Sequence, residues 1–226
     1  MTRYKWYKIR IPDSPTAFMK RIKAIKFAAD THSGFLPAFD DAMAPNTLRF
    51  LWRSAVTTTS FDELGNRTNQ TIKSVEQLLV TLYVANDLVW LRVTDPPRSM
   101  RELFNALERV GGFGMAIDPH VFSAKQQVQM LRRCTDFRLI GLRGVGSSTE
   151  HRFVARIELA SKEGIQPKRL PFLEQLRFTA DHSSYEIVEQ GLQGQVTFTA
   201  TGVVRVAGPI LPFILSQLEA ELGIGR

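Results

Sequence analysis

The alternation of apolar and polar residues along this chain predicts mainly β-strands. Residues 3–11 form the first predicted strand. The face expected to meet the core holds Lys5, Tyr7, Ile9 and Ile11. The face expected to be exposed holds Tyr4, Trp6, Lys8 and Arg10. Aromatic and basic side chains are therefore predicted to share one accessible surface.

Further strands follow the same pattern. Residues 47–61 read as one long strand, and residues 77–93 read as a hairpin that turns at Asn86–Asp87, a favoured pair for tight hairpin turns. Residues 136–159 read as a second hairpin with its turn at 144–148. Residues 175–208 add two or three strands. The best of these strands place Val196, Phe198, Ala200, Val204 and Val206 on one face, and Thr197, Thr199, Thr201 and Arg205 on the other.

Four segments have helical character. The first runs to about Ala29, with Ser14 as N-cap, Pro15 at the first helical position, and an apolar stripe of Phe18, Ile22, Ile25 and Ala29. The second has the capping-box spacing Ser99–Glu102 and a stop at Gly111. The third covers about 123–133, and the fourth covers 209–222 and ends at Gly223.

Strands arranged in hairpins, without alternating βαβ units, indicate an α+β fold. We expect a largely antiparallel, curved sheet with about four helices packed on it. The segments 92–111 and 205–223 share a strand–proline–helix layout, so one interpretation is two similar halves, 1–113 and 114–226, each ending in a helix. The alternative is one continuous domain, because any strand followed by an amphipathic helix resembles this layout.

The charge is concentrated at one end of the sequence. The net charge is +7 and the pI is near 9.8, values that permit binding to polyanions. Residues 1–30 hold eight Lys and Arg against two Asp, which gives +6. The candidate nucleic-acid-binding residues are Arg3, Tyr4, Trp6, Lys8, Arg10, Lys20, Arg21, Lys23, Lys26, Arg49 and Arg53. The basic side chains would contact phosphates and the aromatic ones would stack on bases. A solvated edge strand and helix explain the same residues without a ligand.

No motif in the sequence specifies a reaction. The four His and the single Cys134 lack the spacing of a metal site or a cysteine hydrolase, so no catalytic residue, metal or cofactor is predicted. A metal-dependent nuclease is a minor alternative, with Asp40, Asp41, Glu158 and Lys162 as its loose candidates.

The expected location is the cytoplasm. One cysteine allows no internal disulfide, and neither an apolar signal core nor a run long enough to cross a membrane is present. The leading hypothesis is a non-enzymatic nucleic-acid-binding protein, with no membrane partner, that works within a larger complex. The alternative is a structural or adaptor subunit, with a protein partner or a second copy bound at exposed strand edges and at the closing helix.

Overall fold

The computed structural model describes residues 1–38, 46–148, 153–167, 170, 173 and 176–224. The fold is α+β with antiparallel strand pairing, which confirms the predicted fold class. The described residues contain four helices: α1 (Pro15–Ala24), α2 (Arg101–Gly111), α3 (Ala124–Leu131) and α5 (Leu211–Glu221).

The chain divides into two compact units. Unit 1 comprises Met1–Tyr7 and Asp118–Arg226, and unit 2 comprises Lys8–Ile117. Strands β1 (Thr2–Arg10) and β6 (Ala116–Pro119) cross the boundary between the units. The division near residue 117 lies close to the boundary expected from sequence, but the first seven residues belong with the C-terminal part of the chain. Whether the two halves are duplicates stays a prediction.

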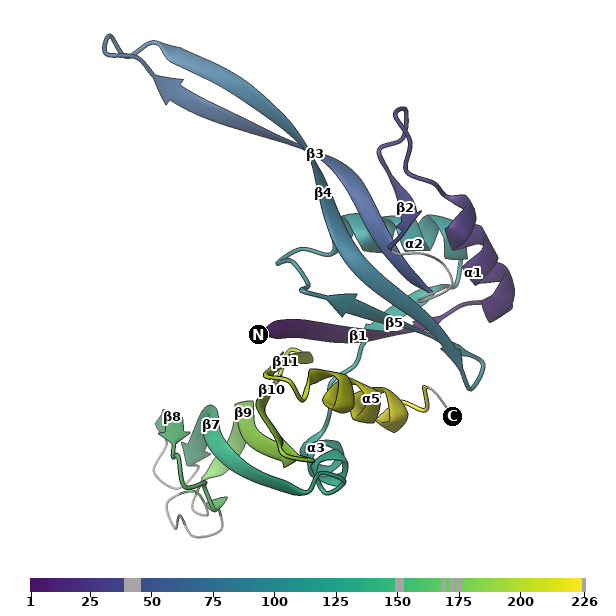
Figure 1. Ribbon diagram of the computed structural model, residues 1–226. Coiled ribbons are helices and arrows are strands. Elements are labelled where there is room, and N and C mark those ends of the chain that lie inside the picture. Colours follow the sequence, from purple (N-terminus) through teal and green to yellow (C-terminus); the bar gives the residue numbers. More distant parts are fainter. Residues whose placement is uncertain (39–45, 149–152, 168–169, 171–172, 174–175, 225–226) are drawn as a thin grey trace. The chain divides into compact units, whose positions relative to one another are not determined.

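In unit 2, four strands pair antiparallel in the order β2-β3-β4-β5 (Figure 1). Their bounds are β2 Ser33–Pro37, β3 Thr47–Phe61, β4 Arg67–Ala85 and β5 Leu88–Thr94. One face of this sheet carries Phe50, Val80 and Leu91, which are fully buried together with Ile22 of α1 and Leu107 of α2. Burial of these side chains is the main force that holds the two helices on the sheet.

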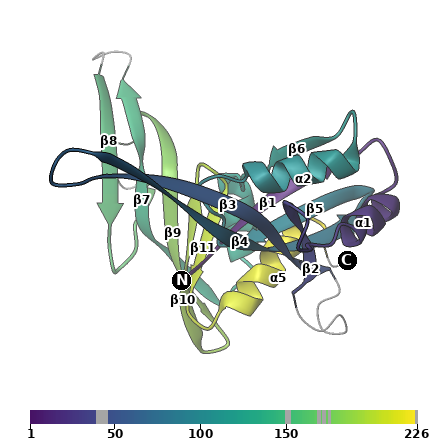
Figure 2. The same cartoon turned by 90° about the horizontal axis from the view of Figure 1, so that it is seen from above.

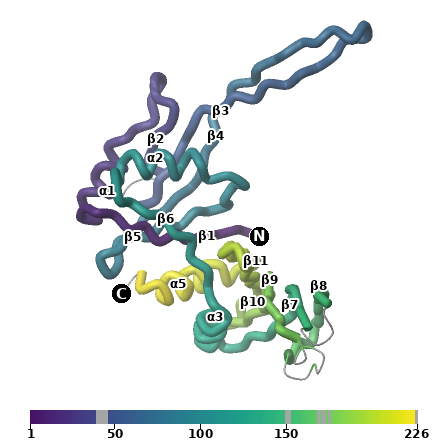
Figure 3. The backbone as a smooth tube through the Cα atoms, turned by 180° about the vertical axis from the view of Figure 1, so that it is seen from behind, coloured from purple at the N-terminus to yellow at the C-terminus, as the bar shows by residue number. Residues whose placement is uncertain are grey.

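In unit 1, the strand order is β1-β11-β10-β9-β7-β8. The bounds are β7 Asp136–Ser148, β8 Phe153–Ala160, β9 Arg177–Glu189, β10 Leu192–Thr199 and β11 Val203–Ala207. Strands β7, β8 and β9 lie side by side (Figure 2), and α3 and α5 lie next to each other (Figure 3). The covered face holds Val196, Phe198, Val204 and Val206, as the sequence pattern predicted, and Ile214 and Leu218 of α5 are buried with it. Ala200, which was predicted on the same face, is instead exposed in the turn after β10.

Two helix predictions need correction. Helix α1 ends at Ala24 and not near Ala29, because Ile25 leaves the helical conformation and Lys26 forms a bridge with Phe35 of β2. Helix α2 has Met100 as its N-cap with no side-chain cap, so the predicted Ser99–Glu102 capping box is wrong. A capping box is present at α3, where Ser123 and Gln126 cap each other.

The strand predictions fared better. The hairpin at Asn86–Asp87 is confirmed, and both residues have positive φ. The turn predicted at 144–148 is wrong, because these residues belong to β7 and Gly144 pairs with Ile157 of β8. The connection between β7 and β8 falls at 149–152, outside the described residues. Strand β2 was not among the strands predicted from the sequence.

Candidate nucleic-acid interface

Two of the predicted contact residues are core residues. Tyr4 and Trp6 were predicted on an exposed face of the first strand, but Trp6 is fully buried and Tyr4 nearly so. The Trp6 ring meets Phe122 edge to face, with ring centroids 5.6 Å apart. Tyr7 and Ile9, on the opposite face, are also buried, so β1 is covered on both faces. Tyr4 and Trp6 therefore cannot stack on bases in this structure.

The predicted basic residues divide between the two units. Arg3 lies in unit 1, whereas Lys8, Arg10 and all the later candidates lie in unit 2. Lys20 and Lys23 are exposed on α1, and Lys26 is exposed just beyond it. The Arg21 guanidinium donates to Asp13 at 2.6 Å, and this hydrogen bond, with one from the Ser14 backbone, lowers the pKa of Asp13. Lys20 and Lys23 are thus exposed on α1, and Arg21 of the same helix binds Asp13.

The Arg53 side chain binds the backbone of the segment that follows α1. Its Nε donates to the carbonyl oxygen of Thr31 at 2.9 Å, and its Nη2 donates to that of Ala29 at 2.7 Å. The guanidinium also lies over the Phe27 ring. Arg49, on the same strand, donates to the carbonyl oxygen of Pro37 at a long 3.4 Å. Both arginines brace the segment between α1 and β3.

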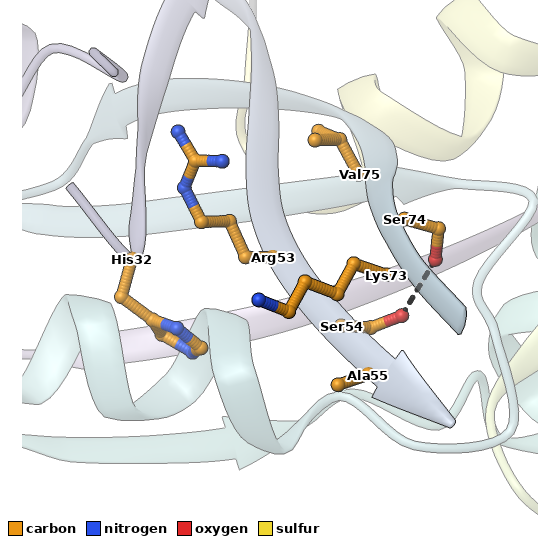
Figure 4. Close-up of a pocket in the computed structure, with 7 residues that line it drawn as sticks. All are labelled: His32, Arg53, Ser54, Ala55, Lys73, Ser74 and Val75. Carbon is orange, nitrogen blue, oxygen red and sulfur yellow. Dashed lines mark hydrogen bonds between the residues drawn. The ribbon is translucent and has the colours of Figure 1, made fainter. Parts of the chain in front are cut away.

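A basic pocket of about 530 Å³ lies beside Arg53 in unit 2. Figure 4 shows Lys73 extending toward the side of the pocket where His32 lies, whereas the Arg53 guanidinium points the other way. His32 is 3.2 Å from Glu102 of α2, and Arg53 is bound to backbone carbonyls. Two of these three basic residues, His32 and Arg53, therefore already have polar partners.

The basic face of unit 1, which we define as Arg3, Lys5, Arg143, His182 and Arg205, was not predicted as a set. Arg3 lies directly opposite Arg205 on paired strands β1 and β11. Arg143 of β7 lies opposite His182 of β9, which in turn lies opposite Thr199 of β10. Since opposite residues share a face, these side chains emerge on the face not packed by α5.

A cavity of about 290 Å³ opens on the basic face. It is lined by Arg143, Asp181, His182, Thr199, Ala200, Thr201, Val203 and Arg205. Hydrogen bonds hold the threonine hydroxyls in place on one side of the cavity. The Thr199 hydroxyl oxygen lies 2.9 Å from that of Thr201 and accepts a hydrogen bond from the Val203 N–H at 3.0 Å. Strand pairing thus brings two arginines together beside hydrogen-bonded threonine hydroxyls.

The cavity lining contains two arginines, Arg143 and Arg205, and one carboxylate, Asp181. Burial lowers the pKa of His182, and the neighbouring Arg143 and Arg205 lower it further, against smaller opposing effects of Asp181 and Glu158. Arg143 Nη2 lies 2.7 Å from His182 Nδ1, a geometry in which a neutral imidazole accepts a hydrogen bond from the arginine. The two arginines favour an anion in this cavity, whereas the burial that contributes most to the His182 shift disfavours a charge of either sign.

Lys5 extends the basic face along β1. Its ammonium lies 5.3 Å from the centre of the Tyr7 ring, and burial raises the pKa of Tyr7 to about 12, so the ring is neutral. Partial burial lowers the pKa of Lys5. Lys5 was placed on the core-facing side by the sequence pattern, and it is half-exposed. Arg205 was recognisable only as the polar member of a strand, since its neighbours come from distant parts of the sequence.

The described residues contain no group of three or more His, Cys, Asp or Glu side chains placed to hold a metal ion. Glu158 of β8 lies opposite Arg143 of β7, and Lys162 is exposed just after the end of β8. Asp40 and Asp41 lie outside the described residues.

Comparison of the sequence with protein-family models and with curated proteins found no match. Within the described ranges, the helices are too short and too polar to cross a membrane.

Proposed function

We propose that this protein is a non-enzymatic, cytoplasmic nucleic-acid-binding protein that contacts the phosphate backbone through the basic face of unit 1. The observation that carries the proposal is the cavity in which Arg143 and Arg205 flank His182 above threonine hydroxyls. Guanidinium groups and hydroxyls are common donors to phosphate oxygens.

The spread of the cations favours a chain of phosphates over one small anion. Arg3 and Arg143 stand on β1 and β7, which are separated by β11, β10 and β9. At about 4.8 Å per strand, their backbones are roughly 19 Å apart. A single phosphate cannot span that distance, whereas successive phosphates of a nucleic acid can.

Because Tyr4 and Trp6 are buried, the proposed binding does not include stacking of these rings on bases. With these rings in the core, the affinity would come from charge neutralisation and hydroxyl contacts, with little reading of base sequence. Both single-stranded and duplex nucleic acids should therefore bind, and binding should depend strongly on salt.

The test is a titration of labelled single-stranded and duplex DNA and RNA, followed by fluorescence anisotropy over a salt series. If four cations each neutralise a phosphate, the log–log slope of affinity against salt should be roughly −3. Arg205→Gln should weaken binding and make the slope shallower by about 0.8. The control is Arg109→Gln, which removes an exposed arginine of α2 in unit 2 and should leave the affinity nearly unchanged. Absence of binding at low salt, or equal effects of the two variants, would contradict the proposal.

A further inference from the structure

The β3–β4 ribbon, defined as residues 53–61 and 67–77, extends beyond the rest of the unit 2 sheet (Figures 1 and 3). Strand β2 pairs with β3 only as far as Trp52, and β5 pairs with β4 only from Leu79. Beyond these points the two strands pair with each other without a register shift. Both faces and both outer edges of the ribbon are accessible, a state in which a two-stranded hairpin is marginally stable at best.

The two edges of the ribbon differ in chemistry. Residues 54–61 of β3 read SAVTTTSF, which contains no charge, proline or glycine and is rich in residues that favour strands. The β4 edge carries Arg67, Lys73 and Glu76. Exposed edges are normally guarded against pairing by charges, prolines or bulges. The β4 edge is guarded in this way, whereas the β3 edge is not.

The backbone of β3 presents a regular set of donors and acceptors at this edge. The Arg53 N–H donates to the His32 carbonyl at 2.9 Å, so the N–H of Arg53 points away from β4. Because successive residues of a strand point their N–H groups in opposite directions, Ala55, Thr57 and Thr59 also direct theirs away from β4. The hydroxyls of Thr57 and Thr71 lie 3.1 Å apart across the ribbon, consistent with a close pair that exchanges no backbone hydrogen bond.

We propose that the β3 edge pairs antiparallel with the β3 edge of a second copy of this chain. The pairing would form a four-stranded sheet in the order β4-β3-β3-β4, with its two-fold axis near Thr57, at the middle of the uncharged residues 54–61. It places threonine opposite uncharged residues and brings no like charges together. Pairing between two β4 edges about Gln70 would instead set Arg67 opposite Lys73.

Symmetry and exposed apolar surface favour the same arrangement. Pairing of β3 with β4 of another copy would leave an edge free at each end and would propagate, whereas pairing of β3 with β3 closes after two copies. The dimer exposes only the guarded β4 edges. It also brings together two copies of Val56 and Ile72, which are 57% and 53% exposed and lie opposite each other in the ribbon.

The test compares Thr57→Pro with Thr71→Pro by sedimentation velocity and light scattering over a range of protein concentrations. The two threonines face each other, so each proline removes an outward N–H from the same place on opposite edges. We expect a dimer for the natural chain and for Thr71→Pro. We expect Thr57→Pro to raise the dissociation constant of the dimer roughly tenfold or more.

A second pair of variants covers the case in which proline distorts the ribbon. Thr57→Lys and Thr71→Lys leave the backbone donors in place, and only Thr57→Lys brings like charges together in the proposed dimer. Circular dichroism checks that all four variants fold. A natural chain that remains monomeric at about 100 μM, the weak end of specific association, would overturn the proposal, as would equal effects of the matched variants at positions 57 and 71.

Discussion

Arg143 combines a buried polar atom that has no partner in the described part of the chain with a place on the proposed binding face. Its Nε is shielded from solvent and has no hydrogen-bond partner among the described residues, and its charge is close enough to that of Arg205 for both to lower the pKa of His182. An unpaired buried donor costs about 1–3 kcal/mol. Arg143→Met should therefore leave the free energy of unfolding unchanged or raise it by about 1 kcal/mol, while nucleic-acid affinity falls several-fold.

Urea denaturation and anisotropy measure these two effects on the same samples. The matched control is Arg138→Met, on the same strand, because Arg138 is already paired with Glu186 and contributes little net charge. This control should reduce nucleic-acid affinity much less. A loss of stability well above 1 kcal/mol in Arg143→Met would instead assign Arg143 a structural role through its bond to His182.

His182 and His120 give unit 1 a dependence on pH. Burial lowers the pKa of His120, whose ring packs against Phe122, and burial with Arg143 and Arg205 lowers the pKa of His182. As the pH falls below about 6.5, the unfolded chain takes up protons that the folded chain does not. The free energy of unfolding should thus decrease from pH 7 toward pH 5.

The measurement is a series of urea midpoints between pH 8 and pH 5, a range above the titration of ordinary carboxylates. His182→Gln should have a flatter profile than the natural chain but retain the part that comes from His120. An identical profile for the variant would show that His182 does not contribute to the dependence.

At the scale of elements, local pattern was sufficient where a strand or turn depends on its own residues. Asn86 and Asp87 adopt positive φ because the hairpin needs it, and these residue types tolerate that conformation. The local sequence pattern gave a wrong prediction where contacts with a distant strand determine the conformation of the backbone. Gly144 resembles a turn residue, but a Cβ there would lie 2.2 Å from the Thr179 carbonyl oxygen, so this glycine permits close strand packing at a shift in the β7–β9 register.

The prediction that Tyr4 and Trp6 lie on an exposed face of β1 was wrong for a related reason. Alternation assigns one face of a strand to the core, and the first strand was read with Tyr7 and Ile9 inside. Phe122 packs on the other face, against Trp6, from more than a hundred residues away. The basic face escaped prediction in the same way, since Arg3, Arg143 and Arg205 are brought together only by strand order. Sequence pattern identified the polar strand that carries Arg205 but not its neighbours.

At the scale of the whole molecule, the positive charge is shared more evenly than the sequence suggested. Residues 1–30 hold most of the net charge, but Arg3 and Lys5 belong to unit 1 and the remainder to unit 2. Unit 1 holds 15 Lys and Arg against 11 Asp and Glu, and unit 2 holds 14 against 11. Net charge alone therefore favours neither unit as the proposed binding site, and the proposal depends on how the charges are arranged.

Two double variants with the same net charge distinguish the effect of the arrangement of charges on nucleic-acid affinity from the effect of net charge. Arg3→Glu with Arg205→Glu, and Lys20→Glu with Lys23→Glu, each lower the net charge from +7 to +3. The first pair alters the basic face and the second pair alters the exposed surface of α1. If the basic face contacts phosphates, the first variant should lose far more affinity and its salt slope should become shallower by about 2. The second variant should lose only the weaker, long-range attraction, which disappears as salt screens it. Equal losses in anisotropy titrations would mean that overall charge governs binding, and a larger loss from the α1 variant would move the contact to unit 2.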